Sequence, residues 1–284
     1  MFVLPEKLPI GYLGTMPEPR TILPRRIRRY PELQLAVDDV LAAEEPLDVR
    51  LSEGGAARSV AITMRTPGDD MNLARGFLFT EGIIGARAQV QCEITDSNVV
   101  EVRLPPGSSI DWERLRRHSY TSSSCGVCGK TSLEQVYTTV PFPESTRPLT
   151  VEPAVLQQLP ERLRQAQPLF AKTGGIHGVA LFTPGGELLH VAEDVGRHNA
   201  LDKLIGHFHA TDSLPLDDHL LLLSGRASFE LLQKAAMAGI RIVAAVGAPS
   251  SLAAAVAEEM DITLVGFLRP TGFNVYHGHE RIAT

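Results

Sequence analysis

The sequence predicts an α/β protein whose C-terminal half contains a βαβαβ unit. Three short segments, 220–223, 241–246 and 262–267, are almost entirely apolar and show no alternation with polar residues. This pattern is typical of parallel strands that are buried on both faces. Segments 228–238 and 248–260, which separate them, have the length and apolar spacing of helices,. Strands that alternate with helices in this way predict a parallel sheet with helices packed against it.

A further hairpin and helix precede this unit. Residues 178–183 and 187–192 flank a Pro-Gly-Gly turn, which predicts two antiparallel strands,. Residues 199–206 have the apolar spacing of a helix,. The C-terminal half is therefore expected to carry regular structure almost without interruption.

The N-terminal half is predicted to be a smaller α+β domain. Segments 47–51 and 60–64 alternate between apolar and polar residues on either side of a glycine turn, which indicates a β-hairpin,. A helix is expected to begin within 66–70 and to end before Gly82,. A strand over 99–104 and a short charged helix over 111–118 complete this half.

Two proline-rich stretches divide the chain. Residues 1–30 contain five prolines and no sustained periodicity, so they are expected to form an extended or disordered arm. Five more prolines fall within 141–160, which indicates a domain boundary or a crossing linker,. We therefore predict an N-terminal α+β domain over 31–145 and a C-terminal α/β domain over 146–284.

Composition narrows the class of protein. The net charge is −6, which argues against non-specific nucleic-acid binding because such binding depends on excess Lys and Arg,. No apolar run reaches the roughly 18 residues that a membrane span needs, so no membrane partner is expected. The basic run 25–29 is not followed by an apolar stretch, and it is interpreted as a solvated arm,. Three cysteines are too few for a disulfide framework of this length, which favours the cytoplasm,.

Two of the three cysteines, Cys125 and Cys128, form a CxxC pair between glycines. The glycines leave both sulfur atoms uncrowded by neighbouring side chains,. Lys130 places a positive charge close by, which favours the thiolate over the thiol,. The pair is therefore predicted to be chemically reactive.

Four uses of this pair differ in class. A structural zinc site needs four ligands, and Cys92 is far away on a probable strand,. A thioredoxin-like pair would lie near the start of its fold, whereas this one is deep in the chain. A zinc nucleobase deaminase needs a proline where Ser124 stands and an upstream H-x-E or C-x-E,. A glycine-flanked loop suits a thiol that carries sulfur as a persulfide from a donor to an acceptor, and no metal is expected.

Three stretches at the predicted carboxyl ends of the parallel strands favour a phosphate-bearing ligand. They are 224–228, which includes Ser224, Gly225 and Arg226, then 247–251, with Ser250 or Ser251 as a helix N-cap, and 267–272. Helix N-termini and their free amides meet at this edge of such a sheet. Each stretch alone could be an ordinary capped turn. None of them is a GxGxxG fingerprint or a Walker loop.

The densest polar stretch, 193–199, lies between a predicted strand and a predicted helix. Arg197 and His198 could contact phosphate or hold a base, and Asp194 could orient either of them or accept from a guanine edge. The alternative is a helix cap with an internal salt bridge. His177, in the glycine-rich bend 174–178, has a slight preference for a functional role over a structural one.

Five motifs together resemble the formate dehydrogenase accessory sulfurtransferases, the FdhD family. The likeness runs from about residue 35 to 282 and leaves out the proline-rich arm. The motifs lie at Ala74–Ile84, Ser124–Gly129, Glu193–Lys203, Ser224–Lys234 and Leu264–Pro270.

The resemblance implies a function. Members of the family take sulfur from a cysteine desulfurase as a cysteine persulfide and pass it to the molybdenum (or tungsten) bis-guanine-dinucleotide cofactor of formate dehydrogenase. It also implies a cytoplasmic homodimer, and a C-terminal part built like the cytidine deaminase fold without its zinc chemistry. A CxxC thiol-disulfide oxidoreductase and a non-enzymatic cofactor chaperone remain as alternatives.

The resemblance also assigns residues. It places the persulfide on Cys125, with Cys128 assisting. The family's cofactor contact segment falls on Phe267, Leu268, Arg269, Pro270, Thr271 and Gly272.

Overall fold

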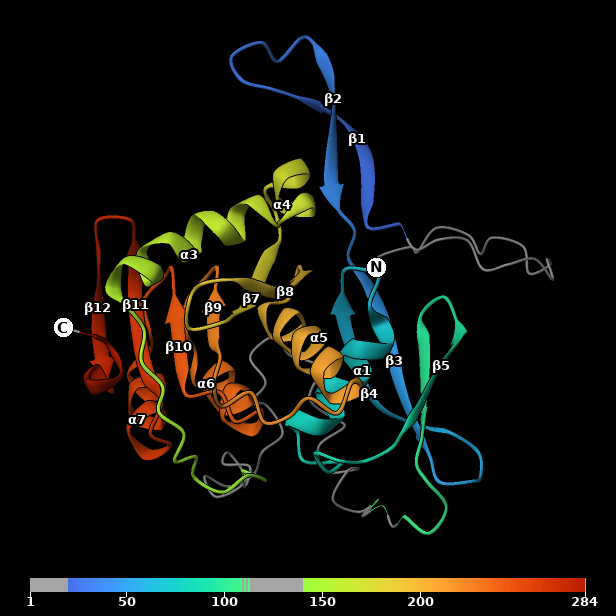
Figure 1. The fold of residues 1–284 in the computed structure, drawn as a ribbon. Helices are drawn as coiled ribbons and strands as arrows, with labels where there is room; N and C mark the ends of the chain where they lie inside the picture. The colour runs from blue at the N-terminus through green and yellow to red at the C-terminus, as the bar shows by residue number, and fades with distance from the viewer. Residues whose placement is uncertain (1–19, 109, 111, 113–139, 284) are drawn as a thin grey trace.

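The computed structural model describes residues 20–108, 110, 112 and 140–283 (Figure 1). The main sheet of this part of the chain has six strands in the order β12-β11-β10-β9-β7-β8. Strands β9, β10 and β11 run parallel, whereas β7 is antiparallel to both β8 and β9, and β12 is antiparallel to β11. The strands are β7 (His177–Phe182), β8 (Leu188–Asp194), β9 (Leu220–Leu223), β10 (Ile242–Ala245), β11 (Thr263–Arg269) and β12 (Gly272–His277).

Helices cover both faces of this sheet, which confirms the predicted α/β class and the parallel βαβαβ unit. Every residue of β9 and β10 is buried, as expected for strands between two helical layers,. One face packs against α3, and the opposite face packs against α5, α6 and α7. The helices are α3 (Pro153–Gln165), α5 (Arg197–Ala210), α6 (Phe229–Met237) and α7 (Ser251–Glu259).

A second sheet of four strands, in the order β4-β3-β6-β5, forms the N-terminal part. The predicted hairpin, helix and strand of this half are confirmed, and Cys92 lies on a strand, β5. One core cluster contains residues from this sheet, from α1 and α5, and from the main sheet. The elements are β3 (Glu45–Ser52), β4 (Arg58–Arg65), α1 (Asp70–Thr80), β5 (Gln91–Asp96) and β6 (Val99–Arg103).

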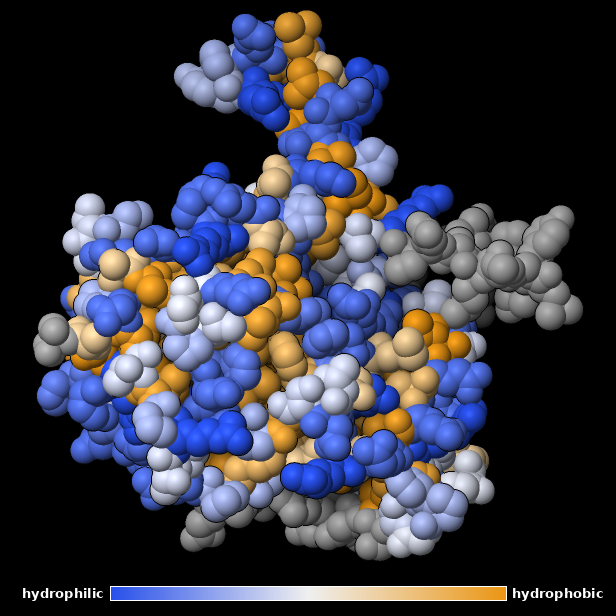
Figure 2. Space-filling view, viewed as in Figure 1, coloured by the Kyte–Doolittle hydropathy of each residue, from blue (hydrophilic) through white to orange (hydrophobic). Residues whose placement is uncertain are grey.

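The predicted N-terminal arm is wrong for residues after 21. Strands β1 (Ile22–Arg28) and β2 (Ala36–Ala42) pair as an antiparallel hairpin that projects from the body of the molecule (Figure 1). The predicted domain boundary at residue 30 cuts through this hairpin. A proline is tolerated here because β1 pairs on one side only,. Figure 2 shows apolar side chains along the hairpin, and Leu23, Leu35 and Leu41 are among its exposed residues.

The predicted linker over 141–160 is also partly wrong, because it contains the first half of α3. Pro153 occupies the first turn of the helix, where the missing N–H costs nothing,. Leu156, Leu159 and Leu163 are buried at helical spacing against the main sheet,. A short helix, α4 (Pro168–Thr173), then leads into β7. Apolar spacing therefore outweighs proline content as a signal in this stretch.

Two glycines allow α1 and α5 to cross in direct backbone contact. A Cβ atom on Gly76 would lie 1.9 Å from the carbonyl oxygen of Asp202, and one on Gly206 would lie 1.9 Å from that of Asn72. No side chain fits at such distances. The crossing therefore joins the four-stranded sheet to the six-stranded sheet.

Buried ion pairs stabilise this junction. Lys203 of α5 contacts Asp194 (2.8 Å) and donates to the carbonyl oxygen of Thr66 (2.8 Å), which follows β4. Lys234 of α6 contacts both carboxylate oxygens of Asp202 at 3.0 Å and donates to the hydroxyl of Thr80 in α1 at 2.8 Å. The same hydroxyl donates to Asp202 (2.8 Å). Each buried charge thus has an opposite charge beside it.

Among the described residues, no helix is long and apolar enough to span a membrane.

The helix crossing leads to a direct prediction. We expect Gly76→Ala to lower the free energy of unfolding by about 3 kcal/mol or more, because the added methyl group collides with backbone that cannot move aside,. Urea denaturation measures the change. Gly85→Ala is the matched control, since nothing lies within 4 Å of a Cβ at that position. Equal midpoints for the two variants would contradict the crossing.

The buried ion pair gives a second prediction. Asp194→Asn leaves the Lys203 ammonium buried without its counter-charge, so we expect a loss of about 3–5 kcal/mol in unfolding free energy,. Arg103→Gln, which breaks an exposed pair with Glu93, should cost less than about 1 kcal/mol,. Thermal and urea unfolding of both variants test this order. A loss as small for Asp194→Asn as for the control would show that the pair stabilises nothing.

Candidate anion-binding site

Five chain segments meet at the carboxyl edge of the parallel strands. Strands β9, β10 and β11 end there, and β7 begins there because it runs antiparallel to β9. Strand β8 ends at the same edge, where His177 pairs with Asp194, and α5 starts three residues later at Arg197. The predicted convergence of strand ends and helix N-termini is present in the structure.

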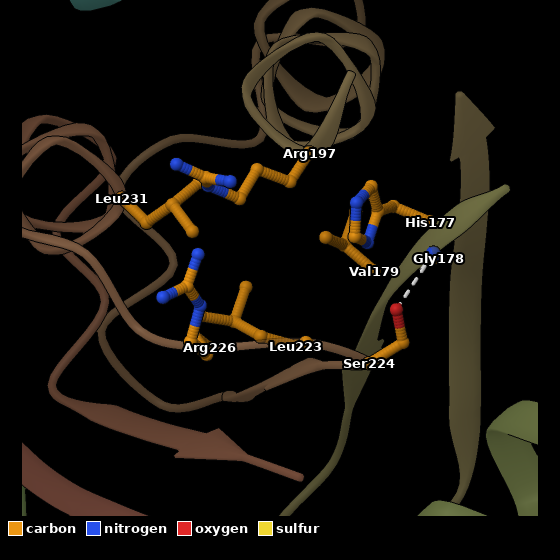
Figure 3. Close-up of a pocket in the computed structure, with 9 residues that line it drawn as sticks. His177, Gly178, Val179, Arg197, Leu223, Ser224, Arg226 and Leu231 are labelled. Atoms are coloured by element: carbon orange, nitrogen blue, oxygen red, sulfur yellow. Dashed lines mark hydrogen bonds between the residues drawn. The ribbon is translucent and has the colours of Figure 1, made fainter. Parts of the chain in front are cut away.

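A small hollow lies at this edge, between the start of β7, the end of β9 and the N-terminus of α5 (Figure 3). Its walls combine apolar side chains with three nitrogen-bearing ones. The lining residues are His177, Gly178, Val179, Arg197, Leu223, Ser224, Gly225, Arg226 and Leu231.

The hollow is positively charged. Arg197 and Arg226 line it from opposite sides, and neither has an ion-pair or hydrogen-bond partner in the described ranges. The Nε atom of Arg197 is fully buried and has no acceptor among the residues that the structure describes. None of the lining residues carries a carboxylate. A buried guanidinium nitrogen without a partner is costly unless a ligand supplies the acceptor, so the site suits an anion.

Close backbone packing holds the loop that carries Arg226. Gly247, just after β10, donates to the carbonyl oxygen of Gly225 (2.8 Å), and a Cβ on Gly247 would lie 3.0 Å from the Cα of Arg226. The hydroxyl of Ser224 accepts from the backbone N–H of Gly178 (3.0 Å), which ties β9 to β7. The predicted N-cap is confirmed at Ser250, whose hydroxyl accepts from Ala253 N–H.

The two histidines near the hollow, His177 and His198, have different surroundings. Burial lowers the pKa of His177, and the positive charges of Arg197 and His198 lower it further. His198 instead lies beside Glu230, with 3.2 Å between Nε2 and Oε2, and 3.4 Å from the hydroxyl of Ser228. Burial alone would raise the pKa of Glu230, but its contacts with His198 and Ser228 and a backbone hydrogen bond together lower it. The Glu230 carboxylate next to the hollow therefore already has hydrogen-bond partners within the fold.

The structure brings four of the predicted ligand-binding residues together in one hollow: Ser224, Gly225, Arg226 and Arg197. His198 lies next to it. The direct ligand contact predicted for Asp194 is contradicted, because its side chain is fully buried, while its predicted role in orienting Arg197 or His198 stays a prediction. Its oxygens face Lys203, the N–H of Thr66 and the N–H of Gly196. Burial raises the pKa of Asp194, and the charge of Lys203 opposes this shift. The 2.8 Å contact with Lys203 is the internal salt bridge that the sequence allowed as the alternative.

The predicted contact segment 267–272 comprises the end of β11, a turn at Pro270 and Thr271, and the start of β12, and none of its residues lines the hollow. The Leu268 side chain is fully buried in the second core cluster, so a side-chain contact from Leu268 is excluded in this structure. Arg269 donates to the carbonyl oxygens of Val246 and Leu268. Phe267 is exposed and has a left-handed backbone (φ 52°), which is strained for an aromatic residue,.

The predicted catalytic pair, Cys125 and Cys128, and the predicted helix over 111–118 lie outside the described residues, apart from Trp112. On one side of this segment, Trp112 donates to Glu53 (3.2 Å) and lies under the Arg58 guanidinium. On the other side, Phe142 packs near Gly239, which precedes β10. That position is the amino end of the main sheet, opposite the hollow.

The sequence only slightly favoured a functional role for His177, and it did not predict that Val179 and Leu231 would line the hollow. The signal available for His177 was the hairpin pattern, because a strand antiparallel to β9 must begin where β9 ends. No group of three or more His, Cys, Asp or Glu side chains arranged for a metal ion occurs in the part of the chain that the structure describes.

Comparison with known proteins agrees with this architecture. The model of the FdhD/NarQ family matches residues 42–283. A relative named "Sulfur carrier protein FdhD" from Streptomyces avermitilis is 52% identical over 256 residues, covering 86% of this chain and 89% of the relative. One of the same name from Sulfurisphaera tokodaii is 43% identical over 252 residues, covering 88% and 94%.

A solved structure has the same fold. It is described as a candidate formate dehydrogenase accessory protein from Desulfotalea psychrophila, and it aligns with a TM-score of 0.72 and 24% identity. The alignment covers 92% of this chain and 98% of that one. The family model spans most of the chain, and the named relatives share up to about half of its residues. The chain therefore belongs to the FdhD/NarQ family.

Proposed function

We propose that the protein is a sulfurtransferase that carries sulfur on Cys125 to a molybdenum (or tungsten) bis-guanine-dinucleotide cofactor. The observation that carries the proposal is the hollow with two guanidinium groups, Arg197 and Arg226, that lack partners among the described residues. A guanine-dinucleotide cofactor contains several phosphates, and arginine side chains are well suited to phosphate oxygens.

In the proposal, the two guanidinium groups of the hollow hold one phosphate group, while the remainder of the cofactor extends along the strand ends. The N–H of Phe267 donates to the carbonyl oxygen of Gly247 (3.0 Å), and Gly247 in turn contacts Gly225. The exposed ring of Phe267 thus lies on the same edge as Arg226. In the proposal, segment 267–272 contacts the flat ring systems, and Arg197 and Arg226 hold phosphate.

The names of the relatives support the sulfur half of the proposal. In it, the Cys125 thiolate attacks the outer sulfur of a persulfide on a cysteine desulfurase, and the donor cysteine leaves as its own thiolate. Cys125 then carries the persulfide. In the proposal the Cys128 thiolate attacks the inner sulfur, a Cys125–Cys128 disulfide forms, the outer sulfur leaves as hydrosulfide towards the cofactor, and a cellular thiol reductant restores the pair.

The proposal includes the cellular setting that the resemblance implies. The protein acts in the cytoplasm as a homodimer, receives sulfur from a cysteine desulfurase and serves formate dehydrogenase. The C-terminal part is expected to share the cytidine-deaminase-like arrangement. These points remain predictions.

Persulfide labelling tests the assignment of sulfur to Cys125. After incubation with a cysteine desulfurase and cysteine, we expect wild-type protein to be labelled and Cys125→Ala to lose the label. Cys92→Ala is the matched control and should label normally, because burial on β5 raises the pKa of Cys92 and keeps its thiol protonated,. Full labelling of Cys125→Ala would refute the assignment. Reduction of an insulin disulfide by the unlabelled protein would favour the oxidoreductase alternative.

A further inference from the structure

His177 is a third nitrogen-bearing side chain of the hollow, and the proposed cofactor site does not use it. It is the first residue of β7, and its ring points into the hollow beside Arg197 (Figure 3). A Cβ on Gly225 would lie 3.4 Å from its Nδ1 atom, so the ring packs directly against the backbone that precedes Arg226. Neither ring nitrogen has a hydrogen-bond partner within the described ranges.

The charges around His177 favour its neutral form while the hollow holds no anion. The N-terminus of α5 contributes Arg197 and His198, whose charges act on the ring, and Arg226 lines the same hollow after the end of β9. The end of β8 contributes Asp194, but Lys203 neutralises this carboxylate at 2.8 Å. The start of α6 contributes Glu230, which is paired with His198. Burial and the nearby cations therefore lower the pKa of His177.

An anion in the hollow reverses this balance. A phosphate or sulfate group brings negative charge between Arg197, Arg226 and the imidazole. An opposite charge within a few ångströms favours the protonated ring. The imidazolium has two N–H donors, whereas the neutral ring has one donor and one acceptor, so protonation also removes a lone pair facing the anion. Binding of the anion and binding of a proton therefore reinforce each other, as reciprocal linkage requires.

We propose that His177 is an anion-binding residue of this hollow, and that it takes up a proton from solvent when a phosphate or sulfate group enters and releases it when the group leaves. The proton adds to a ring nitrogen, and no covalent bond to the ligand forms or breaks. The identity of the natural ligand rests on the proposed function. The coupling itself rests on the geometry of His177, Arg197 and Arg226.

The coupling predicts a pH dependence with a defined sign. In the proposal, the pKa of His177 is higher with the anion bound than in the free protein. The affinity for the anion therefore rises as pH falls through the window between these two pKa values. The affinity advantage of wild type over His177→Gln should grow by up to about tenfold per pH unit in this window. Gln keeps the size and polarity of the side chain but cannot take up the proton.

Calorimetry tests the coupling with two probes, guanosine diphosphate and inorganic sulfate, between pH 5.5 and 8. Titrations in buffers of different ionisation enthalpy give the number of protons taken up per anion bound. Sulfate does not titrate in this range, so any uptake with sulfate belongs to the protein. We expect wild type to take up part of a proton, His177→Gln to take up less, and Arg226→Gln to bind more weakly at every pH while retaining the uptake.

Each outcome has a distinct meaning. Binding of guanosine diphosphate with equal proton uptake in wild type and His177→Gln would overturn the inference and leave the proposed function standing. Uptake that depends on His177 with sulfate, but no binding of guanosine diphosphate, would support the inference and contradict the proposed ligand. Failure of both probes to bind at any pH would overturn both.

Discussion

The packing of α1 against α5 is the constraint on which the rest of the structure depends. Gly76 and Gly206 bring the two helix backbones into contact, and Asp202 and Lys234 place opposite charges in the interior beside Thr80. A charge buried without a partner costs far more than a paired one, so these groups specify how the two parts of the chain fit together. The two halves consequently share a core cluster and pack as one body.

The same junction positions the hollow. Asp194 and Lys203 fix the corner between β8 and α5, and this corner directs Arg197 towards the end of β9. Charges that stabilise the fold are therefore paired and buried, whereas Arg197 and Arg226 remain without partners among the described residues. Asp194 and Arg197, which are only three residues apart, therefore have different roles: Asp194 stabilises the fold, and Arg197 is available to a ligand. Arg226 is available to the same ligand.

Much of the fold and part of the site could be predicted from sequence. The apolar strands β9 and β10 predicted the parallel unit, and the unit predicted that Ser224–Arg226 would lie at a ligand-binding edge. The role of Asp194 was left open between a ligand contact and a salt bridge because its partner Lys203 lies nine residues away on a helix, where spacing alone does not show a contact. The helix α3 and the strand β1 were missed because prolines suggest irregular structure. Pro153 lies in the first turn of α3 and Pro24 lies on an edge strand, where proline is tolerated, whereas Pro160 lies inside α3,. Strand β12 depends on pairing with β11, which no local pattern reveals.

The most direct test of the central claim is complementation of a strain that lacks this protein. We predict that a variant with Ser at both 125 and 128 restores no formate dehydrogenase activity, while Cys92→Ser restores the wild-type level. The double variant should still bind guanosine diphosphate, because the arginine hollow is intact. Full formate dehydrogenase activity with the double variant would contradict sulfur transfer and would identify the protein as a cofactor chaperone.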